Sequence, residues 1–340
     1  MRRARQGGWR RATGASRGLA RVAQLALTMW LVLTLNFALP RLMPGDPLAE
    51  LDNPQSQPVP LSPAARERIR AYYGLERPVA EQYAAYVAGL ARGELGWSLS
   101  YNAPVAQVLA ARLRWTLRLV GVATLLYLAL GVALGALAAW RRGGLLDRAL
   151  LVATAVTGSL PAFFVALLLI LLLGVRLRWL PLGGAQSVAL LDAPWPQRAV
   201  DIARHMVLPV LALVLTSVGD VHLITRNALS QVLAEGFITV ARGKGLRERA
   251  VLWRHALPNA LLPVITLAAL RLGAVVMGAM LVEVAFAYPG IGQAIYQAGI
   301  ARDYPLLQGA FLVTMLATMG ANLLADGLYA LLDPRVRSGA

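Results

Sequence analysis

The sequence contains no cysteine, and it is poor in charged residues. Charged residues make up 15% of its 340 residues, and acidic residues are the scarcer kind, with 17 Asp and Glu against 33 Lys and Arg. The missing cysteines exclude disulfide bonds, thiol catalysis and thiolate metal sites. Because a soluble globular domain usually carries about 25% charged residues, the shortage of charge argues against one.

Apolar residues are abundant and account for 58% of the chain. The formal net charge of +16 could indicate a nucleic-acid binder. Such proteins, however, carry basic patches on a polar surface, whereas the arginines here lie mostly between apolar runs. This distribution is typical of a polytopic membrane protein, and no nucleic-acid partner is expected.

Hydropathy predicts six membrane-spanning helices. A helix that crosses a bilayer needs about 20 mainly apolar residues, and six runs qualify: 20–39, 117–140, 148–175, 205–225, 262–286 and 305–332. Basic residues are concentrated in residues 1–19, in the links 140–148 and 226–256, and after residue 332. Since basic residues in short loops stay on the cytoplasmic side, both termini are predicted to be cytoplasmic. We therefore expect an all-α integral membrane protein.

The first span is interpreted as a retained helix, because no A-x-A-like cleavage site follows it. Residues 1–19 then form a basic cytoplasmic tail. The segment 40–116 is long, and long loops cross the membrane largely regardless of charge. Pro78 begins one helical unit there, and Pro104 begins another that continues into the second span. We expect an external helical cap between helices 1 and 2, followed by a core over residues 117–340.

Polar side chains inside the predicted spans are candidates for lining an aqueous pathway: Asp220, Arg271, Glu283, Asn322 and Asp326. An ionisable group at the bilayer centre costs about 2.5–3.5 kcal/mol on insertion scales. Asp220 and Asp326 could instead be capping or snorkelling groups near the cytoplasmic interface. Arg271 falls near mid-membrane, and we expect it to face a water-filled cavity or a partner subunit.

Motifs of enzymes and nucleotide-binding proteins do not fit this chain. The segment "GASRG" at 14–18 matches the nucleophile pattern G-x-S-x-G, but it lies in the basic tail rather than between a strand and a helix. His205, His222 and His255 lack the spacing of zinc ligands. The "GKG" at 243–245 lacks the spacing of a phosphate-binding loop. We expect no catalytic, metal or cofactor site in this chain, so any ATP must act through a partner.

The basic loop at 229–258 has the pattern of two short amphipathic helices joined at Gly243–Gly245. Apolar residues recur at helical spacing on both sides of the glycines; they are Leu229, Leu233, Gly236, Phe237 and Val240 before them, and Leu246, Ala250, Trp253 and Leu257 after them. Pro258 is expected to end the second helix, because the residue before a proline disfavours helix. The loop could fix topology or lie on anionic lipid. Its glycine corner favours a docking element for another protein.

This loop resembles the EAA loop of permease subunits of bacterial ABC importers. Three residues separate Thr239-Val240-Ala241 from Gly245, and nine more separate Gly245 from His255-Ala256-Leu257-Pro258. Thr239, Val240 and His255 depart from the usual pattern. The resemblance implies a loop that couples to an ATPase, with the following candidate residues: Glu235, Ala241, Arg242, Lys244, Gly245, Leu246, Trp253, His255, Leu257 and Pro258.

Further segments, in order along the chain, resemble the dipeptide, oligopeptide and nickel permease group: "PGDP" (44–47), "YYGLERPVAEQY" (72–83), "RGELGWSL" (92–99), "GSLPAF" (158–163), "WLPLGG" (179–184), "VEVAFAYPGIG" (282–292) and "DPRVR" (333–337). The early "PGDP" and the long external segment are similar to the first, B-type permease of such pairs. The resemblance implies a type I ABC importer permease fold in the bacterial cytoplasmic (inner) membrane.

The resemblance also implies partners. These are a second permease in a heterodimer, two ATPase subunits that carry ATP and Mg²⁺, an external solute-binding protein and membrane lipids. Peptides are the first expected substrate, with nickel or another small solute second, and the chain itself would catalyse no bond change. The main alternative is an ion-coupled secondary carrier, which would need an ion-coupled pair inside the bundle. A membrane-embedded hydrolase is the remaining alternative.

Overall fold

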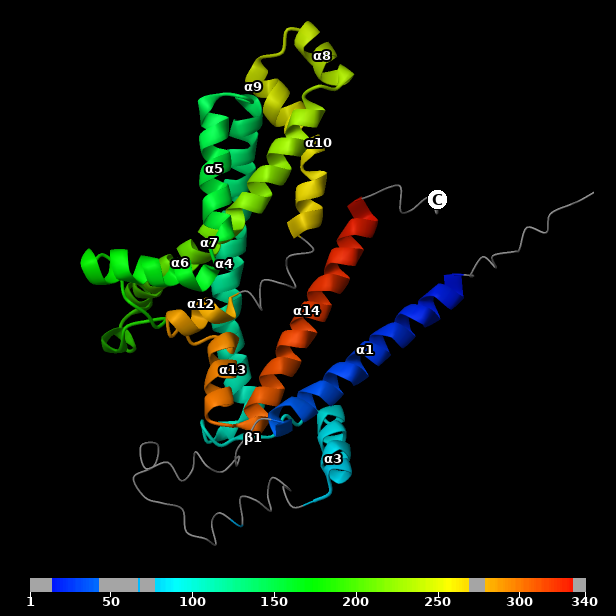
Figure 1. Ribbon diagram of the computed structural model, residues 1–340, viewed down its shortest axis with the longest axis vertical. Helices are drawn as coiled ribbons and strands as arrows, with labels where there is room; N and C mark the ends of the chain where they lie inside the picture. Colours follow the sequence, from blue (N-terminus) through cyan, green and yellow to red (C-terminus); the bar gives the residue numbers. More distant parts are fainter. Residues whose placement is uncertain (1–13, 43–66, 68–76, 269–278, 333–340) are drawn as a thin grey trace, which may run out of the picture. The chain divides into compact units, whose positions relative to one another are not determined.

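The computed structural model describes residues 14–42, 67, 77–268 and 279–332 (Figure 1). Most of these residues are helical, as the sequence predicts. The described residues also include one two-stranded antiparallel sheet. The chain divides into two compact units, Met1–Leu95 and Gly96–Ala340, which are described separately.

The first unit contains α1 (Gly14–Leu42) and α3 (Val79–Ala91). Phe37 is buried, and its ring lies 5.2 Å from the ring of Tyr83 and 5.7 Å from that of Tyr86, measured between centroids. The two tyrosines lie on α3, so this part of the expected external cap is helical, as the sequence predicts. The remainder of the expected cap before α3 lies largely outside the described residues.

The second unit contains the sheet, the long helices and the basic loop. Its elements follow in the order β1 (Trp97–Ser98), β2 (Ala103–Pro104), α4 (Val105–Trp140), α5 (Leu145–Ser159), α6 (Ala162–Leu169), the π-helix η2 (Ile170–Arg176), the 3-10 helix η3 (Val188–Leu190), α7 (Trp195–Val232), α8 (Gly236–Gly243), α9 (Glu248–Ala250), the π-helix η4 (Val251–Ala256), α10 (Leu257–Ala260), α12 (Met280–Ala285), α13 (Ile291–Ile300) and α14 (Tyr304–Leu332).

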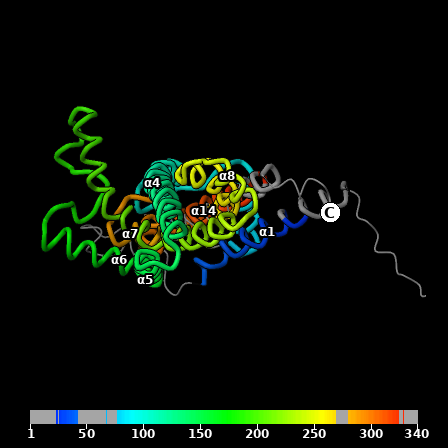
Figure 2. Tube along the Cα trace, turned by 90° about the horizontal axis from the view of Figure 1, so that it is seen from above, coloured from blue at the N-terminus to red at the C-terminus, as the bar shows by residue number. Residues whose placement is uncertain are grey.

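Helices α4 and α7 form the centre of this unit because small residues let them approach closely. A Cβ on Gly131 would lie 2.5 Å from the Cβ of Val221, and one on Gly135 would lie 2.6 Å from the Cβ of Thr225. Only glycine fits such a contact, as is common where membrane helices pack tightly. Helix α4 runs vertically in Figure 1 and is seen nearly end-on in Figure 2.

The predicted span 148–175 is not one straight helix. It consists of α5 and the α6–η2 pair, which meet at a bend of 99° (Figure 1). Leu160 has an extended conformation, with ψ of 138°, and Pro161 follows it. The residue before a proline disfavours the helical region, and the helix therefore breaks here. Pro209, by contrast, lies within the continuous helix α7.

Three helices within the described residues are long and apolar enough to cross a membrane: α4, α7 and residues 304–323 of α14. The bent α5–α6–η2 pair adds a fourth if it counts as one span. The first predicted span corresponds to a shorter apolar stretch of α1, Ala26–Leu42. The predicted span 262–286 is helical at 262–268 and in α12, and its middle lies outside the described residues.

Candidate functional site

The basic loop is built onto the ends of α4 and α7. The side chains that join it to these helices are buried and apolar: Ala136, Ala139, Leu229, Ile238, Ala241, Val251, Leu252, Ala256, Leu257 and Ala260. Burying each of the larger side chains, the leucines, valine and isoleucine, stabilises the arrangement by roughly 1.5–3 kcal/mol. The loop is therefore a fixed extension of the two central helices, so a force on the loop reaches both of them.

The predicted glycine corner is confirmed and is centred on Gly245. This residue has φ of +75°, and Lys244 caps the end of α8 before it. Glycine adopts this left-handed conformation without the steric cost that a Cβ brings. Across the corner, Nε of Arg242 lies 3.0 Å from Oε1 of Glu248. The corner thus reverses the chain sharply, and an ion pair spans it.

The prediction that Pro258 ends the second helix is wrong. The helix continues as a π-helical turn, η4, and then as α10 through Ala260. In an α-helix, a proline lacks a donor and its ring clashes with the preceding turn. The wider π turn accommodates the proline, and Nδ2 of Asn259 donates a 2.7 Å hydrogen bond to the carbonyl oxygen of His255. A side-chain amide therefore satisfies a carbonyl of the altered turn.

The outer side of the loop exposes apolar side chains. They are Phe237, Val240, Leu246 and Trp253, which we name the exposed loop face, and 54% of Trp253 is accessible. Exposed basic residues surround them: Arg242, Lys244, Arg247, Arg249 and Arg254. An apolar patch rimmed by polar residues is typical of a protein interaction site.

The structure divides the other candidate coupling residues between the two sides of the loop. Ala241 and Leu257 belong to the buried cluster, whereas Glu235, His255 and Pro258 are exposed. The apolar residues predicted after the glycines are therefore only partly external, because Leu246 and Trp253 face outwards while Leu257 faces inwards.

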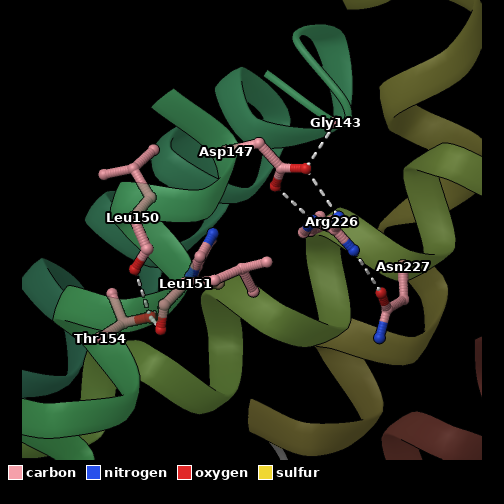
Figure 3. A network of polar contacts seen from close by, with 8 residues as sticks. Gly143, Asp147, Leu150, Leu151, Thr154, Arg226 and Asn227 are labelled. Carbon is pink, nitrogen blue, oxygen red and sulfur yellow. Dashed lines mark hydrogen bonds and ion pairs between the residues drawn. The ribbon is translucent and has the colours of Figure 1, made fainter. Parts of the chain in front are cut away.

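A buried ion pair joins the neighbouring link to α7 (Figure 3). Asp147, at the start of α5, is 1% exposed, and its Oδ1 and Oδ2 accept hydrogen bonds of 2.6 Å and 2.7 Å from Nε and Nη2 of Arg226. The backbone N–H of Gly143 donates a third, of 2.8 Å. Such a bidentate pair fixes geometry as well as charge. One helical turn earlier on α7, His222 Nδ1 lies 2.9 Å from Oγ1 of Thr154 on α5.

Glu283, a predicted pathway candidate, is buried on α12 beside the N-terminus of α13. Oγ1 of Thr116 donates a 2.7 Å hydrogen bond to its Oε1, and the N–H of Gly292 donates one of 2.7 Å to its Oε2. The N–H of Ile291 donates in turn to Oγ1 of Thr116. A carboxylate that accepts N–H groups at a helix N-terminus is stabilised by the helix dipole. Glu283 therefore holds α13 against α4.

The other pathway candidates lie on different helices. Asp220 is exposed on α7, and Asn322 is exposed on α14. Arg271 lies outside the described residues, and for Asp326 the structure describes the backbone alone, within α14. The structure thus places Glu283 in a closed polar cluster, and it does not gather the described candidates into one group.

Two buried aspartates that join distant parts of the fold were missed from the sequence, because their partners are distant along the chain. Asp147 is 79 positions from Arg226. Asp303 accepts hydrogen bonds from Oγ of Ser98 and from the N–H of Ser100, and so ties the β1 turn to the start of α14. The only local signal is an aspartate near a helix start, which is typical of a cap. Among the described residues, no group of three or more His, Cys, Asp or Glu is arranged to hold a metal ion.

The family of binding-protein-dependent transport system inner membrane components matches residues 131–338. A putative peptide permease of Brucella suis biovar 1 is 37% identical, over 92% of this chain and 96% of that protein. The dipeptide transport system permease protein of Escherichia coli K12 is 34% identical, over 89% of this chain and 93% of that protein. A chain of the inward-facing MetNI methionine ABC transporter shares 18% identity and has a TM-score of 0.54, over 67% of this chain and 97% of that chain.

Proposed function

The chain belongs to the family of binding-protein-dependent transport system inner membrane components, and we propose that it forms half of the translocation pathway of an ABC importer for peptides. It is an inner-membrane transport subunit and not an enzyme. The observation that carries the peptide assignment is the identity of 34–37% to peptide and dipeptide permeases over about nine-tenths of the chain. These relatives favour peptides over nickel.

In the complete fold proposed here, six helices cross the membrane and both termini are cytoplasmic. The three or four spans among the described residues support this number. The apolar stretch of α1 and the helical residues on both sides of 269–278 would supply the others. The fold likeness to a methionine importer chain supports a type I permease. The segment 40–116 would form the external cap.

The proposed assembly has four further subunits. A second permease completes the pathway, two cytoplasmic ATPases hold ATP and Mg²⁺, and an external solute-binding protein delivers the peptide. The exposed loop face would enter a groove of one ATPase, with its arginines at the rim. An apolar helix face with a basic border suits such helix-in-groove binding.

ATP binding and hydrolysis on the partners would then move the loop. The buried cluster below the loop passes this movement to α4 and α7. The Asp147–Arg226 pair adds α5 to the same moving body. Because α5 leads into the 99° bend, the movement also reaches α6 and η2. In this mechanism the chain opens and closes the pathway, while bond breaking stays on the ATPases.

The experiment combines co-purification with uptake. The permease pair is purified with its ATPases, and ATP-driven uptake of a radiolabelled dipeptide is measured in proteoliposomes with the solute-binding protein. We expect Trp253→Ala to weaken ATPase retention at least about 30-fold, because buried tryptophans in interfaces often contribute 2 kcal/mol or more. Trp195→Ala is the matched control, since Trp195 is 67% exposed but lies at the opposite end of α7.

The alternative, an ion-coupled carrier, makes the opposite prediction. Uptake would then proceed without ATPases and would follow an imposed proton or sodium gradient. That result, or full ATPase retention by Trp253→Ala together with normal uptake, would refute the proposal.

A further inference from the structure

A hydrogen-bonded group of four polar side chains lies where α4 begins and α13 passes beside it. Nη1 of Arg112 on α4 donates a 3.2 Å hydrogen bond to Oε1 of Gln293 on α13. Nη2 of Arg112 donates one of 2.6 Å to the hydroxyl of Tyr101, and this hydroxyl lies 2.5 Å from Oε1 of Gln297. The Arg112 guanidinium also lies over the Tyr101 ring, 5.1 Å from its centroid.

The direction of every hydrogen bond in this group is fixed by arginine, which can only donate. The Tyr101 hydroxyl accepts from Arg112, so its own proton goes to Gln297. Gln293 likewise must turn its oxygen towards Arg112. Both amide oxygens are therefore used inside the group, and both amide NH₂ groups remain. The hydrogen-bonding capacity that remains in this group therefore consists mainly of donors. These are the two amide NH₂ groups and the other N–H groups of Arg112.

The charge of Arg112 is not neutralised by a contact ion pair within the described part of the chain. Glu283, whose charge acts on Arg112 only through space, accepts hydrogen bonds from Thr116 and Gly292 and forms no contact ion pair with Arg112. A cation with two neutral partners and several free donors attracts an anion with oxygen acceptors. Guanidinium groups match the geometry of a carboxylate especially well.

The position of Arg112 along α4 indicates on which side of the membrane this group lies. Arg112 and Trp140 are separated by about 42 Å along α4, at 1.5 Å per residue. This exceeds the hydrocarbon thickness of about 30 Å. Since Trp140 precedes the basic link proposed to be cytoplasmic, Arg112 lies at the outer aqueous interface, where a solute enters.

We propose that Arg112, Gln293 and Gln297 form an anion subsite that receives the terminal carboxylate of the peptide at the outer mouth of the pathway. The proposal rests on the proposed function, because it names a contact for the same substrate. Arg112, Tyr101 and Gln293 are only partly exposed. A small chain-terminal carboxylate reaches such recessed donors more readily than the surface of a large protein does.

The test measures binding directly, on the complete importer in detergent and without the solute-binding protein. The probes are dialanine and its C-terminal amide, and binding is followed by saturation-transfer NMR. We expect dialanine to bind and the amide to bind at least about tenfold more weakly, because hydrogen bonds to charged groups are the stronger kind. Arg112→Gln should weaken dialanine binding by a similar factor. Arg114→Gln is the matched control, since Arg114 is exposed two residues further along α4.

A second variant guards against loss of folding. Gln297→Glu keeps an acceptor for Tyr101 at an exposed position, but it places a negative charge in the site, and it should weaken dialanine binding in a variant that still assembles with the ATPases. Equal binding of acid and amide, or unchanged binding by Arg112→Gln, would overturn the subsite. So would a variant that binds dialanine normally but loses stimulation by the solute-binding protein, since the group would then be a docking contact. If the wild-type importer takes up no dipeptide at all, the proposed function fails instead.

Discussion

Two ion pairs near the basic loop differ in burial, and burial decides what each contributes. Asp147 and Arg226 are largely enclosed, and the carboxylate also accepts the N–H of Gly143. Arg242 and Glu248 are about half exposed. Removing one partner of a buried pair leaves an uncompensated charge, which costs about 3–5 kcal/mol. An exposed pair contributes only about 0–1 kcal/mol.

We therefore expect Asp147→Asn to lower the free energy of unfolding by about 3–5 kcal/mol and Glu248→Gln by no more than about 1 kcal/mol. Denaturant unfolding of the purified permease in detergent would measure both. Adding Arg226→Gln to Asp147→Asn should lower the free energy of unfolding little further. The double variant no longer contains a buried guanidinium charge without a carboxylate partner. Similar small losses for Asp147→Asn and Glu248→Gln would contradict the structural role of the buried pair.

At the scale of single elements, the corner of the basic loop depends on backbone conformation and not on packing. Gly245 has φ of +75°, yet a Cβ on it would meet no atom within 4 Å. Gly243 also has open space, but it has an ordinary helical φ. Substitution at the two positions therefore separates the conformational demand from side-chain bulk.

We expect Gly245→Val to distort the corner, because a β-branched residue with positive φ is strongly disfavoured. The exposed loop face would then be misplaced, and ATP hydrolysis would continue without peptide uptake. Gly243→Ala should leave coupling intact, since alanine favours helix over glycine by about 1 kcal/mol. The ratio of dipeptide imported to ATP hydrolysed in proteoliposomes measures coupling. Normal coupling in Gly245→Val would show that the corner does not position the docking face.

The sequence predicted the elements of this loop better than their boundaries. Helical spacing and the glycine pair located both helices and the turn. The π turn was not predicted from the sequence. It shifts the angular positions of the residues around it, so that Val251 and Leu252 are buried while Trp253 is exposed. The presence of a proline did not by itself predict where a helix ends. Pro161 follows a helix break, whereas Pro258 lies inside a helix whose π turn accommodates it.

At the scale of the whole molecule, hydropathy predicted which segments are apolar but not how they run. The span 148–175 is apolar throughout, yet it bends by 99° after α5. Hydropathy depends on composition, whereas the bend depends on one backbone conformation at Leu160. A bent pair of this kind can be a broken span, which places its ends on opposite sides, or a re-entrant loop, which returns to the same side. The contacts Asp147–Arg226 and Ser98–Asp303 were equally hidden, since tertiary packing alone brings them together.

The absence of cysteine offers a direct way to determine the course of this bent segment. Leu145 at the start of α5 is 86% exposed, and Val188 beyond η2 is 83% exposed. A cysteine at either position should react equally with a maleimide in detergent, so any difference in the membrane reports the side and not burial. If the pair is a broken span, a membrane-impermeant maleimide added to spheroplasts labels Val188→Cys at once. It labels Leu145→Cys only after permeabilisation, because the basic link at 140–148 is proposed to be cytoplasmic. Protection of both cysteines would make the pair a re-entrant loop and would reduce the number of crossings. Labelling of Leu145→Cys in intact spheroplasts would reverse the proposed orientation.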